Sequence, residues 1–266
     1  CATCKLAGGL TRRLFRKGHV RDRVRALACY LVQLVFMYIS VPPEDAHMAA
    51  GAAVSLAACG SEAAGVAHSE QFGLVLRALE NERRAGQGRA ALSEEDMSSV
   101  QERVFELKLV ILRIVRFDLT MEMPPDHVDG LVGHLLAYLP GGAAALVRDF
   151  RLRWAELGGN EAESDEDFAE ALDASALKKL IAGLARRSLD DMLLSMGPLL
   201  APPSAVAAGA VLAAMQVISS SRSFATEELL RSLAAADRWL DLQDVRRVFE
   251  EWGECRKGQG KPVIFA

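Results

Sequence analysis

Hydrophobic residues recur every three or four positions along most of the chain, which is the spacing of one face of an α-helix. In the first half, these faces predict helices over about residues 6–15, 19–38, 68–82 and 93–115. Another helix is predicted after Pro42-Pro43, because proline is well tolerated in a first helical turn. Alternating runs of β-branched and aromatic residues, which are typical of strands, are missing. The pattern therefore predicts an all-α protein.

Two of the predicted helices consist mainly of small residues. One follows Pro42-Pro43 and the other follows Pro202-Pro203, and each contains the run Ala-Ala-Gly-Ala. A helix with so little side-chain bulk lets neighbouring backbones come close, which suits the centre of a close-packed bundle. We therefore expect central helices at Asp45–Ala58 and Ala205–Ile218, within an internal duplication of a five-helix bundle.

The second half of the chain repeats the plan of the first with one addition. Its helical faces cover about residues 126–139, 144–157, 177–189, 226–235 and 240–252. Residues 158–173 contain glycine, many acids and no base, which predicts a solvated insert. We expect a first repeat over residues 1–120, a second over 121–253 that carries this insert, and a C-terminal tail over 254–266.

Charge is distributed unevenly along the chain. The 266 residues carry a net charge of −4, and the isoelectric point is near 5.8. Between Cys1 and Ser40, eight Lys or Arg accompany the single acid Asp22, whereas Glu156–Asp173 holds eight acids and no base. The chain as a whole is therefore not a polycation, and its basic residues concentrate near the start.

The five cysteines are an odd number without the spacing of a disulfide framework, which predicts reduced thiols in the cytosol or nucleus. Cys1 and Cys4 form a CxxC pair, but a zinc knuckle needs a second ligand pair about 12–20 residues further on. His19 and Cys29 do not form such a pair, so the CxxC is interpreted as part of a helix or a fragment end. No apolar run reaches the roughly 18 residues of a membrane span, so no membrane interaction is expected.

Short motifs in both halves follow a common order. The first small-residue helix ends in Ala58-Cys59, and the helix before it opens with Val20–Arg23. The second half contains Leu184–Arg187, the small-residue stretch Val206–Gln216 with its final Gln, and the closing segment Ser223–Trp252. In that segment the matching residues are Thr226, Glu228, Leu229, Leu233, Val245 and Arg247. With the duplicated bundle, these motifs resemble the core of the general transcription factor TFIIB and its relative Brf, which is a pair of cyclin repeats.

This resemblance implies an all-α fold of two five-helix cyclin-like repeats in tandem, with the acidic insert in the second. It implies a nuclear, non-enzymatic transcription initiation factor that scaffolds the TATA-binding protein, or a related factor, on promoter DNA. Promoter DNA alone would be bound weakly. RNA polymerase would be reached through a segment before Cys1, where a zinc ribbon is expected, and no cofactor is expected within the chain itself.

The chain departs from the family pattern at residues that touch DNA. TFIIB-like proteins place Gly-Arg-Ser before the third helix of each repeat, where this chain has Val41–Asp45 and Ala201–Ser204. The Arg of the recognition helix is replaced by Leu242 or Gln243. Such divergence fits a lineage with unusual promoters, for example a trypanosomatid.

Two basic sets are candidates for phosphate contacts, because Lys and Arg supply sequence-independent affinity for DNA. The N-terminal set comprises Arg12, Arg13, Arg16, Lys17, Arg21, Arg23 and Arg25. The set on the closing helix-turn-helix comprises Arg238, Arg246 and Arg247. The N-terminal set is equally compatible with a DNA contact and with solvated helix faces. In the C-terminal set, Asp237, Asp241 and Asp244 lie among the arginines and favour a solvated face.

A divergent cyclin, acting as the regulatory subunit of a protein kinase, is the alternative, because cyclins share the fold. Cyclins carry a Lys just after the third helix and a Glu on the fifth, which together grip the kinase. Here those places hold Cys59 and Lys108. A regulatory subunit would also need an exposed surface around the third and fifth helices of the first repeat.

An enzyme is not indicated by the sequence. The five histidines fall in different elements, and neither a Gly-rich phosphate loop nor HExxH occurs. His47 is interpreted as a surface or packing residue. Trp154, Trp239 and Trp252 are interpreted as core or rim residues, with partner anchors as the alternative.

Overall fold

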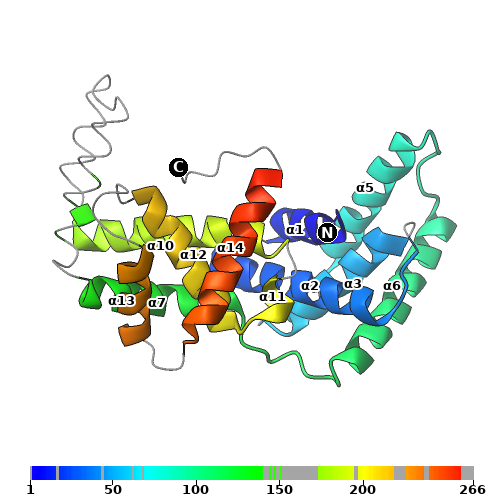
Figure 1. Cartoon of the computed structure of the whole chain (residues 1–266). Helices are drawn as coiled ribbons and strands as arrows, with labels where there is room; N and C mark the ends of the chain where they lie inside the picture. Colours follow the sequence, from blue (N-terminus) through cyan, green and yellow to red (C-terminus); the bar gives the residue numbers. More distant parts are fainter. Residues whose placement is uncertain are drawn as a thin grey trace, which may run out of the picture. The chain divides into compact units, whose positions relative to one another are not determined.

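The computed structural model describes residues 2–15, 18–42, 45–61, 63–67, 69–139, 144, 146, 147, 150, 173–194, 197–218, 226–236 and 240–258. Within these ranges the regular structure is α-helical, which confirms the all-α prediction (Figure 1). The chain divides into two compact units, Cys1–Met123 and Pro124–Ala266. The boundary expected after residue 120 lies slightly before the observed one.

The first unit is built around its small-residue helix. Its helices are α1 (Ala2–Leu14), α2 (His19–Tyr38), α3 (Ala46–Cys59), α4 (Ala64–Ala67), α5 (Glu70–Gly86) and α6 (Glu94–Ile114). Helix α3 packs against α1, α2 and α6, and every residue from Ala49 to Ala58 is buried. A Cβ added to Gly51 would come within 3.1 Å of Leu76 Cδ1, which belongs to α5. The small residues therefore allow the close approach expected of a central helix.

Capping signals in the sequence set the limits of α5 and α6. Ser69 caps α5 by accepting a backbone hydrogen bond, and Ser93 and Asp96 form a reciprocal capping box at the start of α6. Helix α5 continues into the flexible link predicted over residues 85–88. Gly88, at φ 69°, then supplies the left-handed conformation that commonly follows a helix end.

The second unit has a small-residue helix in the same role. Its helices are α7 (Pro124–Tyr138), α10 (Ala174–Met192), α11 (Gly197–Leu200), α12 (Pro203–Ile218), α13 (Thr226–Ala236) and α14 (Leu242–Gly258). Helix α12 packs against α7, α10 and α14, and its residues from Ala205 to Met215 are buried. An added Cβ on Gly209 would come within 3.2 Å of Val248 Cγ1 on α14. The two predicted central helices thus occupy the cores of their own units.

Several details differ from the sequence-based expectations. Val20, expected to face the core, is 44% exposed because it lies in the first turn of α2. Helix α14 continues into the tail expected over residues 254–266. Helices α4 and α11 are too short to produce a periodic pattern and were not predicted. Most of the helix predicted over 144–157, and the acidic insert apart from Asp173, lie outside the described residues.

Candidate functional site

The N-terminal basic set begins at the end of α1. Arg13 donates hydrogen bonds to both carboxylate oxygens of Glu82 on α5, at 3.1 and 3.2 Å. Arg12 is exposed and has no ion pair among the described residues. Arg16 and Lys17 lie outside the part of the chain that the structure describes. On α1, Arg12 is therefore the arginine most available to a phosphate.

The three arginines of α2 are held in different environments. Arg21 is half-buried and lies 3.5 Å from a carboxylate oxygen of Asp22. Arg23 is also half-buried and donates a hydrogen bond of 3.1 Å to a backbone carbonyl after α6. Arg25 is only 7% exposed, and its Nε lies 3.2 Å from where a Cβ on Gly8 would be. In the folded unit Arg25 is thus a packing residue beneath α1, and its burial removes it from the surface that could meet DNA.

The C-terminal basic set is balanced by acids. Arg246 contacts the Glu227 carboxylate of α13 at 2.6 Å, and Arg247 contacts Asp244 at 2.6 Å. Arg247 also donates to the carbonyl of Leu200. Exposed ion pairs contribute only about 0–1 kcal/mol, so these arginines could exchange partners, but the acids lower the local positive potential. Arg238 lies outside the described residues.

A second candidate surface lies on the first unit, where α5 and α6 border a pocket of about 530 Å³. Its lining includes two large apolar side chains that face solvent, Leu74 of α5 at 57% and Phe105 of α6 at 59% exposure. Leu109, one turn further along α6, is 39% exposed. We call Leu74, Phe105 and Lys108, which line this pocket, the α5–α6 groove. Exposed apolar side chains grouped in this way mark an interaction surface more often than scattered ones do.

Lys108 supplies the cation of the α5–α6 groove. Burial lowers the pKa of Lys108, while the nearby Cys59 thiol, when ionised, would raise it. No ion pair of Lys108 is found among the described residues, and Cys59 is exposed at the end of α3. A carboxylate brought in by a partner would therefore relieve the cost of holding this ammonium group half-buried.

The α5–α6 groove was not among the sequence-based predictions. The core-facing stripe of α6 consists of Met97, Val100, Val104, Leu107 and Ile111. Phe105 directly follows Val104, so the helical turn of about 100° per residue carries it away from that stripe. Phe105, an aromatic residue outside the core-facing stripe, is therefore the feature of the sequence that could have indicated this exposed surface.

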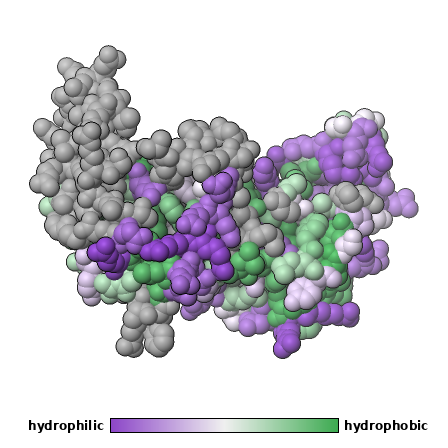
Figure 2. Space-filling view, in the orientation of Figure 1, coloured by the Kyte–Doolittle hydropathy of each residue, from purple (hydrophilic) through white to green (hydrophobic). Residues whose placement is uncertain are grey.

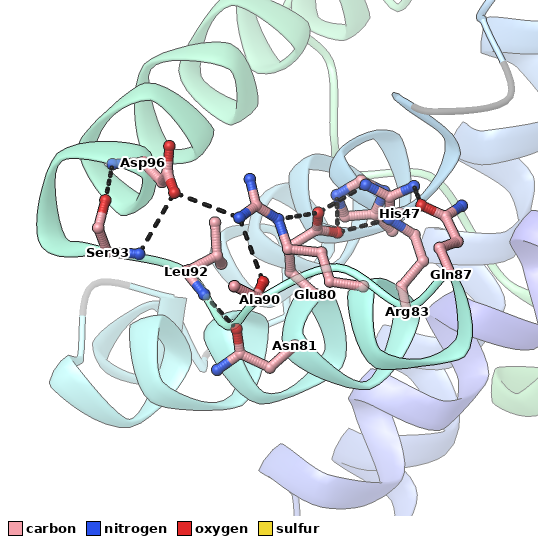
Figure 3. A network of polar contacts seen from close by, with 10 residues as sticks. His47, Glu80, Asn81, Arg83, Gln87, Ala90, Leu92, Ser93 and Asp96 are labelled. Atoms are coloured by element: carbon pink, nitrogen blue, oxygen red, sulfur yellow. Dashed lines mark hydrogen bonds and ion pairs between the residues drawn. The ribbon is translucent and has the colours of Figure 1, made fainter.

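A buried ionic network joins α3, α5 and the start of α6 (Figure 3). His47 Nε2 lies 2.6 Å from Glu80 Oε2, and the two side chains are 5% and 2% exposed. Arg83 donates to both Glu80 oxygens, at 2.8 and 2.6 Å, while Arg84 bridges from Glu80 to Asp96. Figure 2 shows hydrophilic side chains gathered over the end of the unit where α5 joins α6. His47 is therefore buried within this network rather than on the surface.

The pKa of Glu80 shows which influence prevails in this network. Burial by itself would raise the pKa of Glu80, but the hydrogen bond from Arg83 and the charges of His47, Arg83 and Arg84 lower it. The net pKa lies below its ordinary value, so Glu80 remains an anion. Because both side chains are buried, a substrate could not reach the His47–Glu80 pair. The pair instead links helix α3 to helix α5.

Among the described residues, no cluster of three or more His, Cys, Asp or Glu side chains is placed to hold a metal ion. None of the described helices is both long and apolar enough to cross a membrane.

The chain was also compared with known proteins. A scan against protein-family models and a search of curated proteins each gave no match. The TFIIB-like and cyclin-like interpretations therefore rest on the motifs and on the two units with their buried small-residue helices.

Proposed function

We propose that the protein is a non-catalytic scaffold of two cyclin-like repeats that acts in transcription initiation, as a TFIIB core does. It would hold the TATA-binding protein, or a related factor, on promoter DNA and contact RNA polymerase in the nucleus. The observation that carries this proposal is the repetition of one plan, a buried small-residue helix at the centre of each unit. The motifs shared with TFIIB, in the same order, support it.

The placement of the arginines supports a function that depends more on contacts with partner proteins than on contacts with DNA phosphates. Arg25 is enclosed, and Arg13, Arg246 and Arg247 face acids. Phosphate contacts supply most of the non-specific affinity for DNA. Free duplex should therefore be bound weakly. The chain should bind more tightly to DNA on which a partner protein is already bound, because it can then contact both.

Salt dependence tests this division between protein and DNA contacts. On free duplex we expect log affinity to fall with log salt at a slope of about −3 to −4, from three or four phosphate contacts near α1 and α2. Replacing Arg12 and Arg13 by Glu should flatten the slope by about 1 to 2, because Arg12 has no ion pair among the described residues whereas Arg13 must first leave Glu82. Replacing Arg246 and Arg247 by Glu, the matched control on α14, should change it less. Fluorescence anisotropy at several salt concentrations measures both slopes.

Three results would contradict the promoter-scaffold proposal. The first is tight binding of free duplex at physiological salt, and the second is a larger effect from the α14 changes than from the α1 changes. The third is affinity purification of the tagged chain that recovers neither a TATA-binding-protein-type factor nor RNA polymerase.

A second candidate function, regulatory subunit of a protein kinase, is favoured by the α5–α6 groove. This surface lies between α5 and α6, the fourth and fifth full-length helices of the first unit, and its Lys108 lies near Cys59 at the end of α3, the third. Lys108 would pair with a carboxylate of the kinase, and Phe105 would enter an apolar pocket of the partner. Truncation of buried aromatic anchors at interfaces commonly costs 2 kcal/mol or more, which is about a 30-fold loss of affinity.

Point variants in the groove separate the two functions. Phe105→Ala and Lys108→Glu should each reduce recovery of a kinase at least about tenfold in a pull-down, if the kinase is the partner. Met37→Ala, an exposed apolar residue on α2, is the matched control and should leave recovery unchanged. A stoichiometric kinase without polymerase or TATA-binding protein would favour this second function. Its absence from the wild-type pull-down would exclude it.

A further inference from the structure

Two cysteines meet at the contact between α1 and α2. Cys4 lies on α1 and Cys29 on α2, and both are 0% exposed. Cys4 Sγ lies 3.8 Å from the carbonyl oxygen of Cys29, and Cys29 Sγ lies 3.8 Å from the carbonyl oxygen of Cys4. Each thiol is therefore directed at the backbone of the other residue, and the relation is reciprocal.

This reciprocal placement is the arrangement from which a disulfide can close. A disulfide requires Cα atoms about 4.4–6.8 Å apart and side chains that point toward each other. Helices α1 and α2 pack against each other, so these backbones are already neighbours. We therefore expect the bond to close by rotation of the two side chains, each of which already contacts the backbone of the other residue.

The packed state keeps this pair reduced. The pKa of the Cys4 thiol lies well above its ordinary value. The hydrogen bond with Cys29 is the largest cause and burial is the second. Because the thiolate is the reactive form, the enclosed thiol is a poor nucleophile. This fits the reduced cysteines expected from their odd number.

We propose that Cys4 and Cys29 are a disulfide-forming pair, which a peroxide-class oxidant converts into a covalent link between α1 and α2. One thiol loses its proton and the thiolate attacks a peroxide oxygen; the O–O bond breaks and the leaving hydroxide takes up that proton, so that a sulfenic acid and water form. The second thiol then displaces water from the sulfenic sulfur and closes the S–S bond. For hydrogen peroxide, two thiols and one peroxide give one disulfide and two waters.

Oxidation must begin from a locally opened state, because both sulfurs are enclosed. Local opening of secondary elements exposes buried groups without unfolding the whole chain. The oxidation rate should therefore rise in low urea concentrations that favour opening of α1. Once formed, the link would prevent α1 from leaving α2, and α1 also contacts α3 and α5. The first unit would then be harder to unfold.

The test is oxidation of the folded full chain with hydrogen peroxide, followed by alkylation after unfolding and peptide mapping. We expect two of the five thiols to be protected, one cross-link between Cys4 and Cys29, and full reversal by dithiothreitol. The melting temperature should rise by roughly 5–10 °C, since the link closes a loop in the unfolded chain.

Serine variants identify the pair. Cys4→Ser and Cys29→Ser should abolish the protected pair, whereas Cys1→Ser and Cys59→Ser should keep it. Because either core variant could lower stability by itself, the wild-type cross-link map carries the conclusion. Protection of Cys1 with Cys4, an intermolecular link through Cys59, or five thiols that remain free after oxidation in low urea would each overturn the proposal.

Discussion

Replacing Glu80 by Gln is expected to lower the free energy of unfolding of the first unit by about 3–5 kcal/mol. The Glu80 side chain is 2% exposed, and its two oxygens lie 2.6 Å from His47 Nε2 and from Arg83. Glutamine keeps the size of the side chain but removes its charge. His47, Arg83 and Arg84 then lose their counter-charge at a position where Glu80 and His47 are almost fully enclosed, and that loss is the source of the large effect.

Glu82→Gln is the matched control for this variant. Glu82 lies two positions further along α5, but its ion pair with Arg13 is exposed, so the change should cost less than about 1 kcal/mol. All three tryptophans lie in the second unit, whereas circular dichroism reports both units. Urea unfolding of Glu80→Gln should therefore shift the dichroism transition more than the tryptophan fluorescence transition. Equal effects from the two glutamine variants would show that the buried network contributes little.

The same network predicts a pH dependence. Because the pKa of Glu80 is lowered in the folded state, its stabilising contribution is complete above the unfolded pKa of about 4.3 and is lost as pH falls through the folded pKa. The stability difference between the wild type and Glu80→Gln should thus be full near neutral pH and shrink in acid below about pH 4.3. Urea titrations across this range measure the difference. A difference that grows in acid would contradict the sign of the shift.

Helix positions were predictable because their signals are local. The range predicted for α2, residues 19–38, matches the observed helix, and the Ser93 cap marks the start of α6. The small-residue runs identified α3 and α12 as buried helices, because few other environments suit a helix without side-chain bulk. Periodicity could not predict α4 and α11, since four residues do not complete two turns.

The candidate sites were harder to predict because their partners are distant in sequence. Arg13 pairs with Glu82 on another helix, and His47 pairs with Glu80 across the unit. A sequence pattern treats such residues as independent surface charges, which is why Arg25 was counted with the DNA-contacting set. Its burial depends on the packing of α1 over α2, which periodicity along one helix does not specify.

Replacing Ala53 or Ala210 by Leu is expected to lower the free energy of unfolding by about 1–3 kcal/mol, because each change forces extra volume into a closely packed helix contact. Both alanines are 0% exposed on the central helices, Ala53 on α3 and Ala210 on α12. Next to them, Gly51 and Gly209 already lie so close to neighbouring side chains that an added Cβ would be 3.1 and 3.2 Å away.

Exposed alanines provide the controls for these two overpacking variants. Ala78→Leu on α5 and Ala137→Leu on α7 add the same volume at positions open to solvent, so each should change stability by no more than about 0.5 kcal/mol. The two core variants should also differ in their readout. Ala210→Leu should shift the tryptophan fluorescence transition of the second unit, whereas Ala53→Leu should act mainly on circular dichroism. If Ala53→Leu or Ala210→Leu unfolds at the same urea concentration as its exposed control, the helix that carries it is not the closely packed centre of its unit. The duplication on which the proposed function rests would then lose its main support.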